Sequence, residues 1–332
     1  MNISIVGATG NVGRKILEVL EKKNFSFDNL YLLASEKSAG KIISFKNKEY
    51  VIKKLEEFDF SKCDISFFSA GGKVAEKFVE KAAKHSIVID NSSYFRMDPD
   101  VPLIVPQVNS KDLNNIKKNI IANANCSTIQ MVIALKPLHD NFTIKRIVVS
   151  TYQSVSGAGK APTDELINQT KLALDNQKIN SKNFTKQIAF NAIPQIDIFS
   201  EDGYTKEEIK MIEETKKILD KNINVTATCV RIPVLISHAE SVNIEFEKEF
   251  SLEKVKSLLE QADGCKVIDE QKDGGYITQV EAAGKNETFI SRIRIDNTNK
   301  NAVNLWIVSD NLLRGAALNA VEIAEAYTKL KK

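Results

Sequence analysis

The sequence predicts an α/β protein with two domains, the first built on a parallel sheet and the second on a mainly antiparallel sheet. Three features support this prediction. Short apolar runs alternate with amphipathic helical stretches near the N-terminus, a pattern typical of parallel strands joined by crossover helices. From about Thr128 the strand-like runs are longer and look antiparallel. The length of 332 residues also favours about two domains.

The N-terminal region begins with a predicted strand at Asn2–Val6, which ends at a glycine. A helix is predicted over Asn11–Lys23, because apolar residues recur there on one face of a 3.6-residue period. The other elements predicted for this region are strands at Leu30–Ala34, Ile65–Ser69 and Ile87–Ile89 and a helix at Lys73–Lys84.

The second region contains longer strands with helices between them. Its predicted strands are Arg146–Gln153, Cys229–Leu235, Ser241–Glu247, Phe289–Asp296 and Ala302–Val308. Its predicted helices are Pro162–Gln177 and Tyr204–Asp220, and an apolar helix over Asn311–Leu330 follows the last strand. The change of pattern near residue 127 marks the expected domain boundary.

Charge and composition exclude several classes of protein. Lysine and arginine number 46 against 43 aspartates and glutamates, a balance too even for a nucleic-acid-binding or polybasic membrane protein. No segment approaches the roughly 18 apolar residues of a membrane-spanning helix, and the N-terminus lacks signal-peptide features. Four cysteines without a CxxC pair argue against disulfides and a zinc site. We expect a cytoplasmic protein without a metal.

A glycine-rich turn follows the first predicted strand. Glycine recurs every three residues in the segment GATGNVG, directly before the first helix. Such a turn lets backbone N–H groups approach a pyrophosphate at the positive end of a helix. The turn predicts dinucleotide binding, with a tight turn for close helix–sheet packing as the alternative. The residues expected at the cofactor are Gly7, Thr9, Gly10, Asn11 and Val12.

The end of the second predicted strand bears on the choice between NAD and NADP. An acidic residue there usually binds the ribose hydroxyls of NAD, whereas NADP needs cations and hydroxyls for its extra phosphate. Glu36 alone would favour NAD. Lys37, flanked by Ser35 and Ser38, suits a phosphate better. We expect NADP, with Glu36 turned to solvent; a polar loop without a ligand is the alternative.

Cys126 is the candidate nucleophile. It follows a polar turn and precedes an apolar stretch predicted to be a helix, which Ser127 or Thr128 could cap. A thiolate at a helix N-terminus is stabilised by unpaired N–H groups and by the helix dipole. The other cysteines lack this context and are expected to be ordinary packed residues: Cys63, Cys229 and Cys265.

A cysteine nucleophile needs a base, and the sequence contains three histidines. His85 lies among charged and polar residues before a strand and is expected at the surface. His139 follows a Pro-Leu pair in a predicted loop. His238 lies between two predicted strands, where a loop would present it, seven residues after Arg231. Position therefore makes His238 the best candidate of the three.

Four segments, in this order, resemble one enzyme family. They are GATGNVG, NANCSTIQ, TYQSVSGAG and RIPVLISHAES. Together they extend over essentially the whole chain and resemble aspartate-semialdehyde dehydrogenase. The resemblance implies a Rossmann-type NADP-binding domain over residues 1–126, joined by a C-terminal helix over 311–332. It also implies a catalytic and dimerisation domain over residues 127–310.

The resemblance further implies an activity and partners. Members of the family reduce L-aspartyl 4-phosphate to L-aspartate 4-semialdehyde with NADPH and release phosphate, through a cysteine thioester. The reaction lies on the route to lysine, threonine, methionine and diaminopimelate. The expected assembly is a homodimer or a tetramer of dimers, with no nucleic-acid or membrane partner.

The motifs imply a role for each matching residue. Cys126 becomes the acylated nucleophile, His238 the general acid/base, and Gln153 the residue that positions the thioacyl intermediate. Arg231 would bind the substrate α-carboxylate, a task that suits the guanidinium fork. The other implied residues are Glu207, with Glu208 as the alternative, for the substrate amino group; Lys210, Arg96 and Asn125 for phosphate; and Ser156, Gly157 and Asn311 beside the nicotinamide.

Two positions depart from the motifs of the family. Ala124 stands where proline commonly precedes the Asn-Cys pair, and alanine is expected to leave the turn looser. Ser237 stands where glycine commonly precedes the histidine, which excludes a positive φ there unless serine tolerates it. Neither change removes a reacting group, so the expected reaction class is unchanged.

Two other functions stay open. A related phosphorylating reductase, such as N-acetyl-glutamyl-phosphate reductase or glyceraldehyde-phosphate dehydrogenase, shares the dinucleotide domain, the thiolate and the histidine. Arg231 together with Glu207 and Lys210 instead favours a substrate with a free amino group. A non-catalytic NADP-binding protein would need no matched set of cysteine, glutamine, arginine and histidine.

Overall fold

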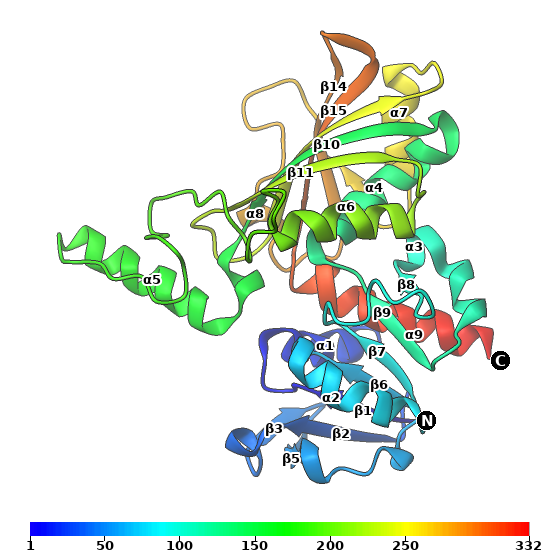
Figure 1. Ribbon diagram of the computed structural model, residues 1–332, viewed down its shortest axis with the longest axis vertical. Helices are drawn as coiled ribbons and strands as arrows, with labels where there is room; N and C mark the ends of the chain where they lie inside the picture. Colours follow the sequence, from blue (N-terminus) through cyan, green and yellow to red (C-terminus); the bar gives the residue numbers. More distant parts are fainter. Residues whose placement is uncertain (332) are drawn as a thin grey trace. The chain divides into compact units, whose positions relative to one another are not determined.

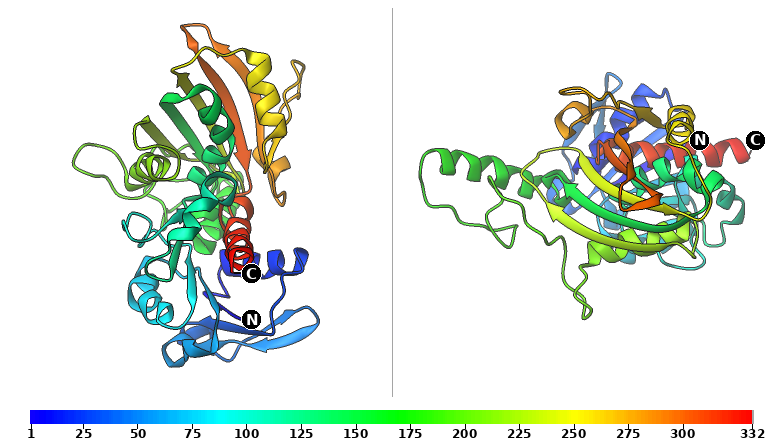
Figure 2. Two further views of the ribbon diagram at one scale, coloured as in Figure 1. Left: turned by 90° about the vertical axis from the view of Figure 1, so that its right-hand side faces the viewer. Right: turned by 90° about the horizontal axis from the view of Figure 1, so that it is seen from above.

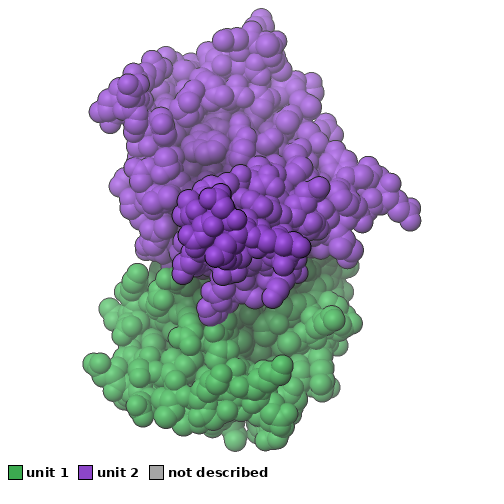
Figure 3. Space-filling model, turned by 90° about the vertical axis from the view of Figure 1, so that its left-hand side faces the viewer, with its two compact units in different colours: residues 1–125, 316–332 green, residues 126–315 purple. Residues whose placement is uncertain are grey.

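The computed structural model describes residues 1–331, which form two compact units. Unit 1 comprises Met1–Asn125 and the C-terminal segment that begins at Ala316, and unit 2 comprises Cys126–Gly315 (Figure 3). The chain therefore leaves unit 1 at Cys126 and returns to it near its end. Each unit has its own sheet.

Unit 1 contains a seven-stranded sheet in the order β5-β2-β1-β6-β7-β9-β8 (Figure 1). Every strand pair in it is parallel, which confirms the parallel sheet expected from the sequence. The strands are β1 (Asn2–Val6), β2 (Asn29–Ala34), β5 (Lys53–Lys54), β6 (Ile65–Phe68), β7 (Ile87–Asp90), β8 (Leu103–Ile104) and β9 (Ile120–Asn123).

The helices of unit 1 follow from apolar periodicity and cover the sheet. Helix α1 (Asn11–Lys22) buries one face, which includes Ile16 and Leu20. Helix α9 (Asn319–Leu330) contacts α1, β7 and the short helix α3 (Pro106–Asn109). The remaining elements of the unit are α2 (Gly72–Ala83), the hairpin β3 (Ile42–Phe45) and β4 (Lys48–Val51), and 3-10 turns at Glu36–Ser38, Leu55–Glu57, Phe60–Lys62 and Ser110–Asn115.

Unit 2 contains a six-stranded mixed sheet in the order β11-β10-β12-β15-β14-β13. The three central pairings are antiparallel, as expected, but β10–β11 and β13–β14 are parallel. The strands are β10 (Ile144–Gln153), β11 (Asn224–Arg231), β12 (His238–Phe246), β13 (Cys265–Val267), β14 (Thr288–Asp296) and β15 (Asn299–Ser309).

Several predicted boundaries in unit 2 are wrong. The strand expected at Cys229–Leu235 begins five residues earlier, at Asn224, and ends at Arg231. It ends two residues before Pro233, because proline cannot donate to a strand ladder and restricts the residue before it. The strand expected to begin at Ser241 begins at His238. His238 is therefore a strand residue and does not lie in a loop.

Helix α4 (Cys126–Phe142) packs across one face of this sheet and forms the core of unit 2. It continues through Pro137, so His139 lies in the helix and not in the expected loop. A proline at position 137 cannot donate to the carbonyl of Ile133. The thiol of Cys265 lies 3.8 Å from that carbonyl oxygen and donates to it instead.

The other helices of unit 2 flank this core or leave it. Helix α6 (Lys206–Ile218) and α7 (Leu252–Gln261) contact α4, and a short helix α8 (Gln279–Ala282) contacts β15. Helix α5 (Lys160–Leu174) forms an arm that extends away from the sheet of unit 2 (Figures 1 and 2). A 3-10 turn at Val155–Ala158 precedes the arm, and a π-helical stretch at Leu313–Leu318 leads into α9.

Candidate functional site

Four side chains lie side by side at one end of the unit 2 sheet. Gln153 is opposite both Arg231 and His238, and His238 is opposite Ser309. Residues directly opposite in neighbouring strands point to the same face, and each of the four is at most 7% exposed. We call these four residues the edge row. They meet because β10, β11 and β15 end, and β12 begins, at one edge of the sheet.

His238 is held as a neutral imidazole. The backbone N–H of Ser154 donates to its Nδ1 over 3.1 Å, and the Ser154 hydroxyl also lies 3.1 Å from that atom. Burial, reinforced by the charge of Arg231, lowers the pKa of His238 to about 3. Because Nδ1 accepts a backbone N–H, we assign the ring proton to Nε2.

The Nε2 atom of His238 is the reactive end of the ring. It has no hydrogen-bond partner among the described residues, and a Cβ added to Gly157 would lie only 3.2 Å from it. Glycine at position 157 thus leaves space next to this N–H group. An N–H donor with adjacent space can serve a substrate oxygen.

The residue before His238 has a left-handed backbone. Ser237 has φ 78°, so serine does tolerate here the left-handed conformation that glycine adopts most easily. Its N–H donates to Oδ1 of Asn311 over 2.8 Å. The same oxygen accepts the hydroxyls of Ser154 and Ser156 at 3.1 and 3.2 Å. Asn311 therefore holds Ser154 and Ser237, the two residues that contact or precede the His238 ring.

Arg231, Glu207 and Lys210 form a second group of charges beside the edge row. Glu207 accepts from Nε2 of Gln153 at 3.2 Å and from Nζ of Lys210 at 3.1 Å. The Arg231 guanidinium donates to the Ser154 carbonyl. Burial lowers the pKa of Arg231, and Glu207 and Cys126 oppose that fall. Burial alone would lower the pKa of Lys210, but the carboxylates of Glu207 and Asp197 outweigh the effect of burial, so the pKa of Lys210 is raised.

Glu208, the alternative to Glu207, serves the fold. Its carboxylate accepts the N–H of Thr205 at 2.6 Å and that of Cys229 at 2.9 Å. Thr205 and Glu208 together make a capping box at the start of α6. Glu208 therefore has its acceptors committed to backbone groups, whereas Glu207 faces Gln153.

Cys126 is the first residue of α4. Ser127 and Thr128 lie inside the first turn of the helix, so the expectation that one of them caps it is wrong; Asn125 directly precedes the helix. Cys126 is half-buried. Burial raises the pKa of the thiol of Cys63 to about 11 and that of Cys265 to about 12, and also raises that of Cys229. These three thiols are poor nucleophiles.

The glycine turn of unit 1 is sterically defined. Gly7 has φ 86° and its carbonyl accepts the N–H of Gly10 at 3.0 Å. A Cβ on Gly13 would lie 2.2 Å from the Gly7 oxygen, a distance that no side chain permits. Thr9, Asn11 and Val12 are partly exposed, and Gly10 is exposed. The turn thus presents backbone at the start of α1, a geometry that fits a pyrophosphate.

The segment after β2 is a 3-10 turn whose polar residues face solvent. Ser35, Glu36 and Lys37 are exposed, and Ser38 is half-buried. The Glu36 carboxylate accepts from Nζ of Lys54 at 3.0 Å. One oxygen of this carboxylate is thus paired with a lysine at the surface.

Arg96 and Asn125 are buried in unit 1. Nε of Arg96 donates to the Asn123 carbonyl at 2.9 Å, and Nη2 donates to the Asn91 carbonyl at 3.0 Å. Asn123 ends β9 and Asn91 directly follows β7. Arg96 is therefore anchored at the carboxyl ends of two parallel strands, where α/β sheets bind ligands.

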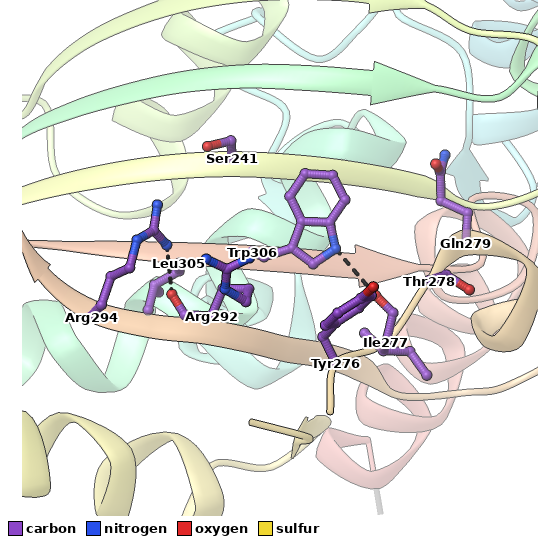
Figure 4. Close-up of a pocket in the computed structure, with 9 residues that line it drawn as sticks. All are labelled: Ser241, Tyr276, Ile277, Thr278, Gln279, Arg292, Arg294, Leu305 and Trp306. Atoms are coloured by element: carbon purple, nitrogen blue, oxygen red, sulfur yellow. Dashed lines mark hydrogen bonds between the residues drawn. The ribbon is translucent and has the colours of Figure 1, made fainter. Parts of the chain in front are cut away.

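A pocket of about 370 Å³ opens on the opposite face of the unit 2 sheet (Figure 4). Ser241 and Trp306, which line it, pair across β12 and β15, and Ser241 alternates with Glu240 along the strand. Trp306 donates to the Ile277 carbonyl at 3.2 Å. The pocket is therefore separate from the edge row.

Sequence reasoning missed one member of the edge row, Ser309, and three polar residues near the row: Gln130, Ser154 and Glu240. Only the spacing of His238 and Glu240, two residues apart as on one strand face, could have pointed to them. Within residues 1–331, no three or more His, Cys, Asp or Glu side chains gather where a metal ion could be held. None of the described helices combines the length and the apolar character that crossing a membrane requires.

Comparisons with known proteins place the chain in a family. Family models match residues 2–116 as "Semialdehyde dehydrogenase, NAD binding domain" and residues 135–314 as "Semialdehyde dehydrogenase, dimerisation domain". The aspartate-semialdehyde dehydrogenase of Aquifex aeolicus is 53% identical, and the match covers 98% of each chain. Aspartate-semialdehyde dehydrogenase 2 of Vibrio cholerae is 49% identical, with 99% of this chain and 98% of that chain covered.

Solved structures agree with these matches. The crystal structure of aspartate semialdehyde dehydrogenase II from Vibrio cholerae, complexed with ASA, superposes with a TM-score of 0.96 at 48% identity and covers 99% of this chain and 98% of that one. The enzyme from Candida albicans, determined with NADP, has a TM-score of 0.72 at 26% identity and covers 98% of each chain. The chain belongs to the aspartate-semialdehyde dehydrogenase family, whose members are oxidoreductases of amino-acid biosynthesis.

Proposed function

We propose that the protein reduces L-aspartyl 4-phosphate to L-aspartate 4-semialdehyde with NADPH and releases phosphate, through a thioester on Cys126. The edge row carries this proposal, because strand register brings the buried Gln153, Arg231 and His238 together in the unit whose first residue is Cys126. The neighbouring Glu207 and Lys210 supply the charges that an amino-acid substrate needs.

Substrate recognition in this proposal uses opposite charges. Arg231 binds the α-carboxylate, for which a guanidinium can supply two parallel N–H donors. Glu207 binds the α-ammonium group; Glu208 is unsuited because both of its oxygens already accept backbone N–H groups. An acetylated amino group would bring no positive charge to Glu207, which favours the free amino acid over an N-acetyl substrate.

The first chemical step joins the Cys126 sulfur to the acyl carbon. The thiolate attacks, a tetrahedral oxyanion forms, and the bond to the phosphate oxygen breaks as phosphate leaves with the electron pair. The N-terminal N–H groups of α4 stabilise the thiolate before attack. Lys210 is proposed to neutralise the departing phosphate, with Arg96 and Asn125 as further ligands implied by the family.

The residues of the glycine turn fit a dinucleotide, since Gly7 and Gly13 create a turn that any side chain at position 13 would close. Gly7, Thr9, Gly10, Asn11 and Val12 would hold the pyrophosphate; Ser35, Lys37 and Ser38 would hold the 2′-phosphate; and Ser156, Gly157 and Asn311 would border the nicotinamide. The reduced nicotinamide, when bound, supplies the hydride that converts the thioester to the aldehyde level.

His238 is proposed to manage the proton. Negative charge on the substrate oxygen favours the protonated ring, and Nε2 is the ring nitrogen without a hydrogen-bond partner among the described residues. Ser154 can support either state of the ring, because its N–H donates to Nδ1 and its hydroxyl can accept from a protonated Nδ1. Gln153, held by Glu207 and Thr151, would position the thioacyl group.

The same proposal includes the assembly and the setting of the enzyme. We infer a homodimer or a tetramer of dimers, supported by the family model that describes residues 135–314 as a dimerisation domain. Exposed apolar side chains on and after the α5 arm also favour a partner surface: Ile167, Leu174, Phe190, Ile198 and Phe199. The four free thiols suit the cytoplasm, and the product would feed lysine, threonine, methionine and diaminopimelate synthesis.

The deciding experiment is the reverse reaction, followed by nicotinamide absorbance. Aspartate semialdehyde should reduce NADP only when phosphate is present, and NADP should be preferred to NAD. N-acetylglutamate semialdehyde and glyceraldehyde 3-phosphate, assayed side by side, should be poor substrates. Preferential turnover of either would overturn the substrate assignment. A Cys126 thiol no more reactive than Cys63 would favour a non-catalytic NADP-binding protein.

A further inference from the structure

A buried glutamate lies directly behind the edge row. Glu240 follows His238 by two residues on β12 and therefore points to the same sheet face. It is opposite Thr151 on β10 and Ile307 on β15 and is fully buried. Neither of its carboxyl oxygens has a hydrogen-bond partner among the described residues.

Gln130 approaches this glutamate from helix α4. It lies four residues, or about one helical turn, after Cys126 and is also fully buried. Its Oε1 accepts the hydroxyl of Ser309 at 3.1 Å. Its amide lies close enough to the Glu240 carboxyl group to oppose the effect of burial on that group. Gln130 therefore connects the helix that begins with Cys126 to β12, the strand of His238, and to the neighbouring strand β15.

The surroundings of Glu240 favour its uncharged form. The side chains next to it in register are a threonine and an isoleucine, and the register places no cation directly opposite Glu240 on either neighbouring strand. Arg231 and Lys210, the cations of the neighbouring group, are directed to Ser154, Glu207 and Asp197. An isolated ionised carboxylate without a cation or a donor is very costly to bury. Burial raises the pKa of Glu240 well above its ordinary range.

We propose that Glu240 is a positioning residue that acts as an uncharged carboxylic acid: with Gln130 and Ser309 it fixes the start of α4, and so Cys126, relative to His238. An uncharged group here also leaves the positive end of α4 free to stabilise a thiolate, which a nearby carboxylate would oppose. The proposal rests on the roles proposed above for Cys126 and His238.

Two substitutions at this position separate shape, polarity and charge. Glu240→Gln keeps the volume and the uncharged polar group, and we expect kcat within about threefold of the unsubstituted enzyme. Glu240→Leu removes the carboxyl group that lies close to the buried amide of Gln130, and a small displacement of reacting groups can cost up to about 100-fold in rate. We expect kcat to fall about ten- to a hundredfold with KM for aspartate semialdehyde nearly unchanged. Gln130→Leu removes the same connection from the helix and should show the same split if Glu240→Leu fails to fold.

Val242→Ala is the matched control, because Val242 is fully buried one step further along the same face of β12. It should lower the melting temperature and leave kcat unchanged. A second readout does not depend on the overall reaction: the rate at which iodoacetamide alkylates Cys126, measured against pH by mass spectrometry of the Cys126 peptide. Glu240→Gln should leave this profile in place, while Glu240→Leu and Gln130→Leu should lower the alkylation rate.

The proposal is overturned if Glu240→Leu folds and keeps full kcat and alkylation rate, since the residue would then only fill space. It is also overturned if Glu240→Gln lowers kcat as much as Glu240→Leu, or speeds Cys126 alkylation at neutral pH, since either result requires an ionised Glu240. If the unsubstituted protein does not turn over aspartate semialdehyde, the alkylation profiles still decide the positioning role, so failure of the proposed reaction is distinguishable.

Discussion

The two candidate binding regions differ in the groups that form them: backbone atoms in unit 1 and side chains in unit 2. The turn at the start of unit 1 is made of backbone: its shape depends on Gly7 and Gly13, and its neighbours are partly exposed. The edge row of unit 2 is made of side chains from four strands, all buried and each held by another polar group. A backbone site tolerates many neighbouring sequences, whereas a side-chain site depends on every partner.

This difference predicts different responses to substitution. Damage to the turn should weaken cofactor binding and leave the thiol chemistry intact. Damage to the edge row should impair the chemical step and leave cofactor binding intact. Substitutions of Cys126, His238 and Gly13 test that separation directly.

Cys126→Ala should have the largest effect, because no other described thiol combines partial exposure with a helix N-terminus. We expect turnover to be abolished while NADPH still binds, as measured by its fluorescence during titration. A variant with substantial activity would contradict the assignment of the nucleophile. Loss of NADPH binding would contradict the separation of the two regions.

His238→Ala should reduce kcat about 10²- to 10⁴-fold, the usual contribution of general acid–base catalysis. Ser154 and Arg231 would lose the ring that they surround. Steady-state kinetics across pH measure the effect, and binding of NADPH serves as the control. A loss of less than tenfold would leave His238 without a role in the chemical step.

Gly13→Ala tests the backbone region. The added methyl would lie 2.2 Å from the Gly7 oxygen, so the turn must move, and overpacking of this kind costs about 1–3 kcal/mol. We expect the Kd for NADPH to rise about ten- to a hundredfold. Alkylation of Cys126 should proceed at the original rate, and a slowed rate would show that the regions are not independent.

Lys37→Ala tests the preference for NADP. A hydrogen bond to a charged group contributes about 1.5–3 kcal/mol, so kcat/KM for NADP should fall at least about tenfold while that for NAD hardly changes. Glu36→Gln is the matched variant at the next residue, and it should have little effect because Glu36 is already paired with Lys54. Equal losses with both cofactors would remove Lys37 from the 2′-phosphate site.

Ser237→Gly should have the smallest effect and the opposite sign. The left-handed φ of 78° costs a serine about 1 kcal/mol, and the buried Ser237 hydroxyl has no partner among the described residues. Removing the side chain should raise the melting temperature by a few degrees and leave kcat near its original value. A lower melting temperature would show that the Ser237 side chain stabilises the loop.

The sequence supported the parallel sheet because its strands are short apolar runs separated by helical periodicity, and β1 was predicted at its observed bounds. The predicted end of an element was wrong near two prolines, Pro137 and Pro233. Pro137 suggested that α4 had ended, but the thiol of Cys265, far along the chain, takes up the freed carbonyl. Pro233 lies within an apolar run, yet the strand ends before it.

The reacting side chains of the candidate site could be selected only through a resemblance, since nothing local distinguishes Glu207 or Lys210 from solvated charges. Their burial depends on the packing of α6 against β11, which no single segment encodes. Glu240 and Gln130 were not predicted as site residues. The start of β12 was predicted three residues too late, so the sheet face that Glu240 shares with His238 was not recognised.

The discontinuity of unit 1 has a consequence for synthesis on the ribosome. Helix α9, which buries Val321 and Ile323 in this unit, is translated after all of unit 2. Domains commonly fold as they emerge, N-terminal first, but here the inserted unit 2 is completely translated before unit 1 has all of its core. Unit 1 is thus mostly synthesised before unit 2 but completes its apolar core after it, and the apolar surface that α9 covers stays exposed in the meantime.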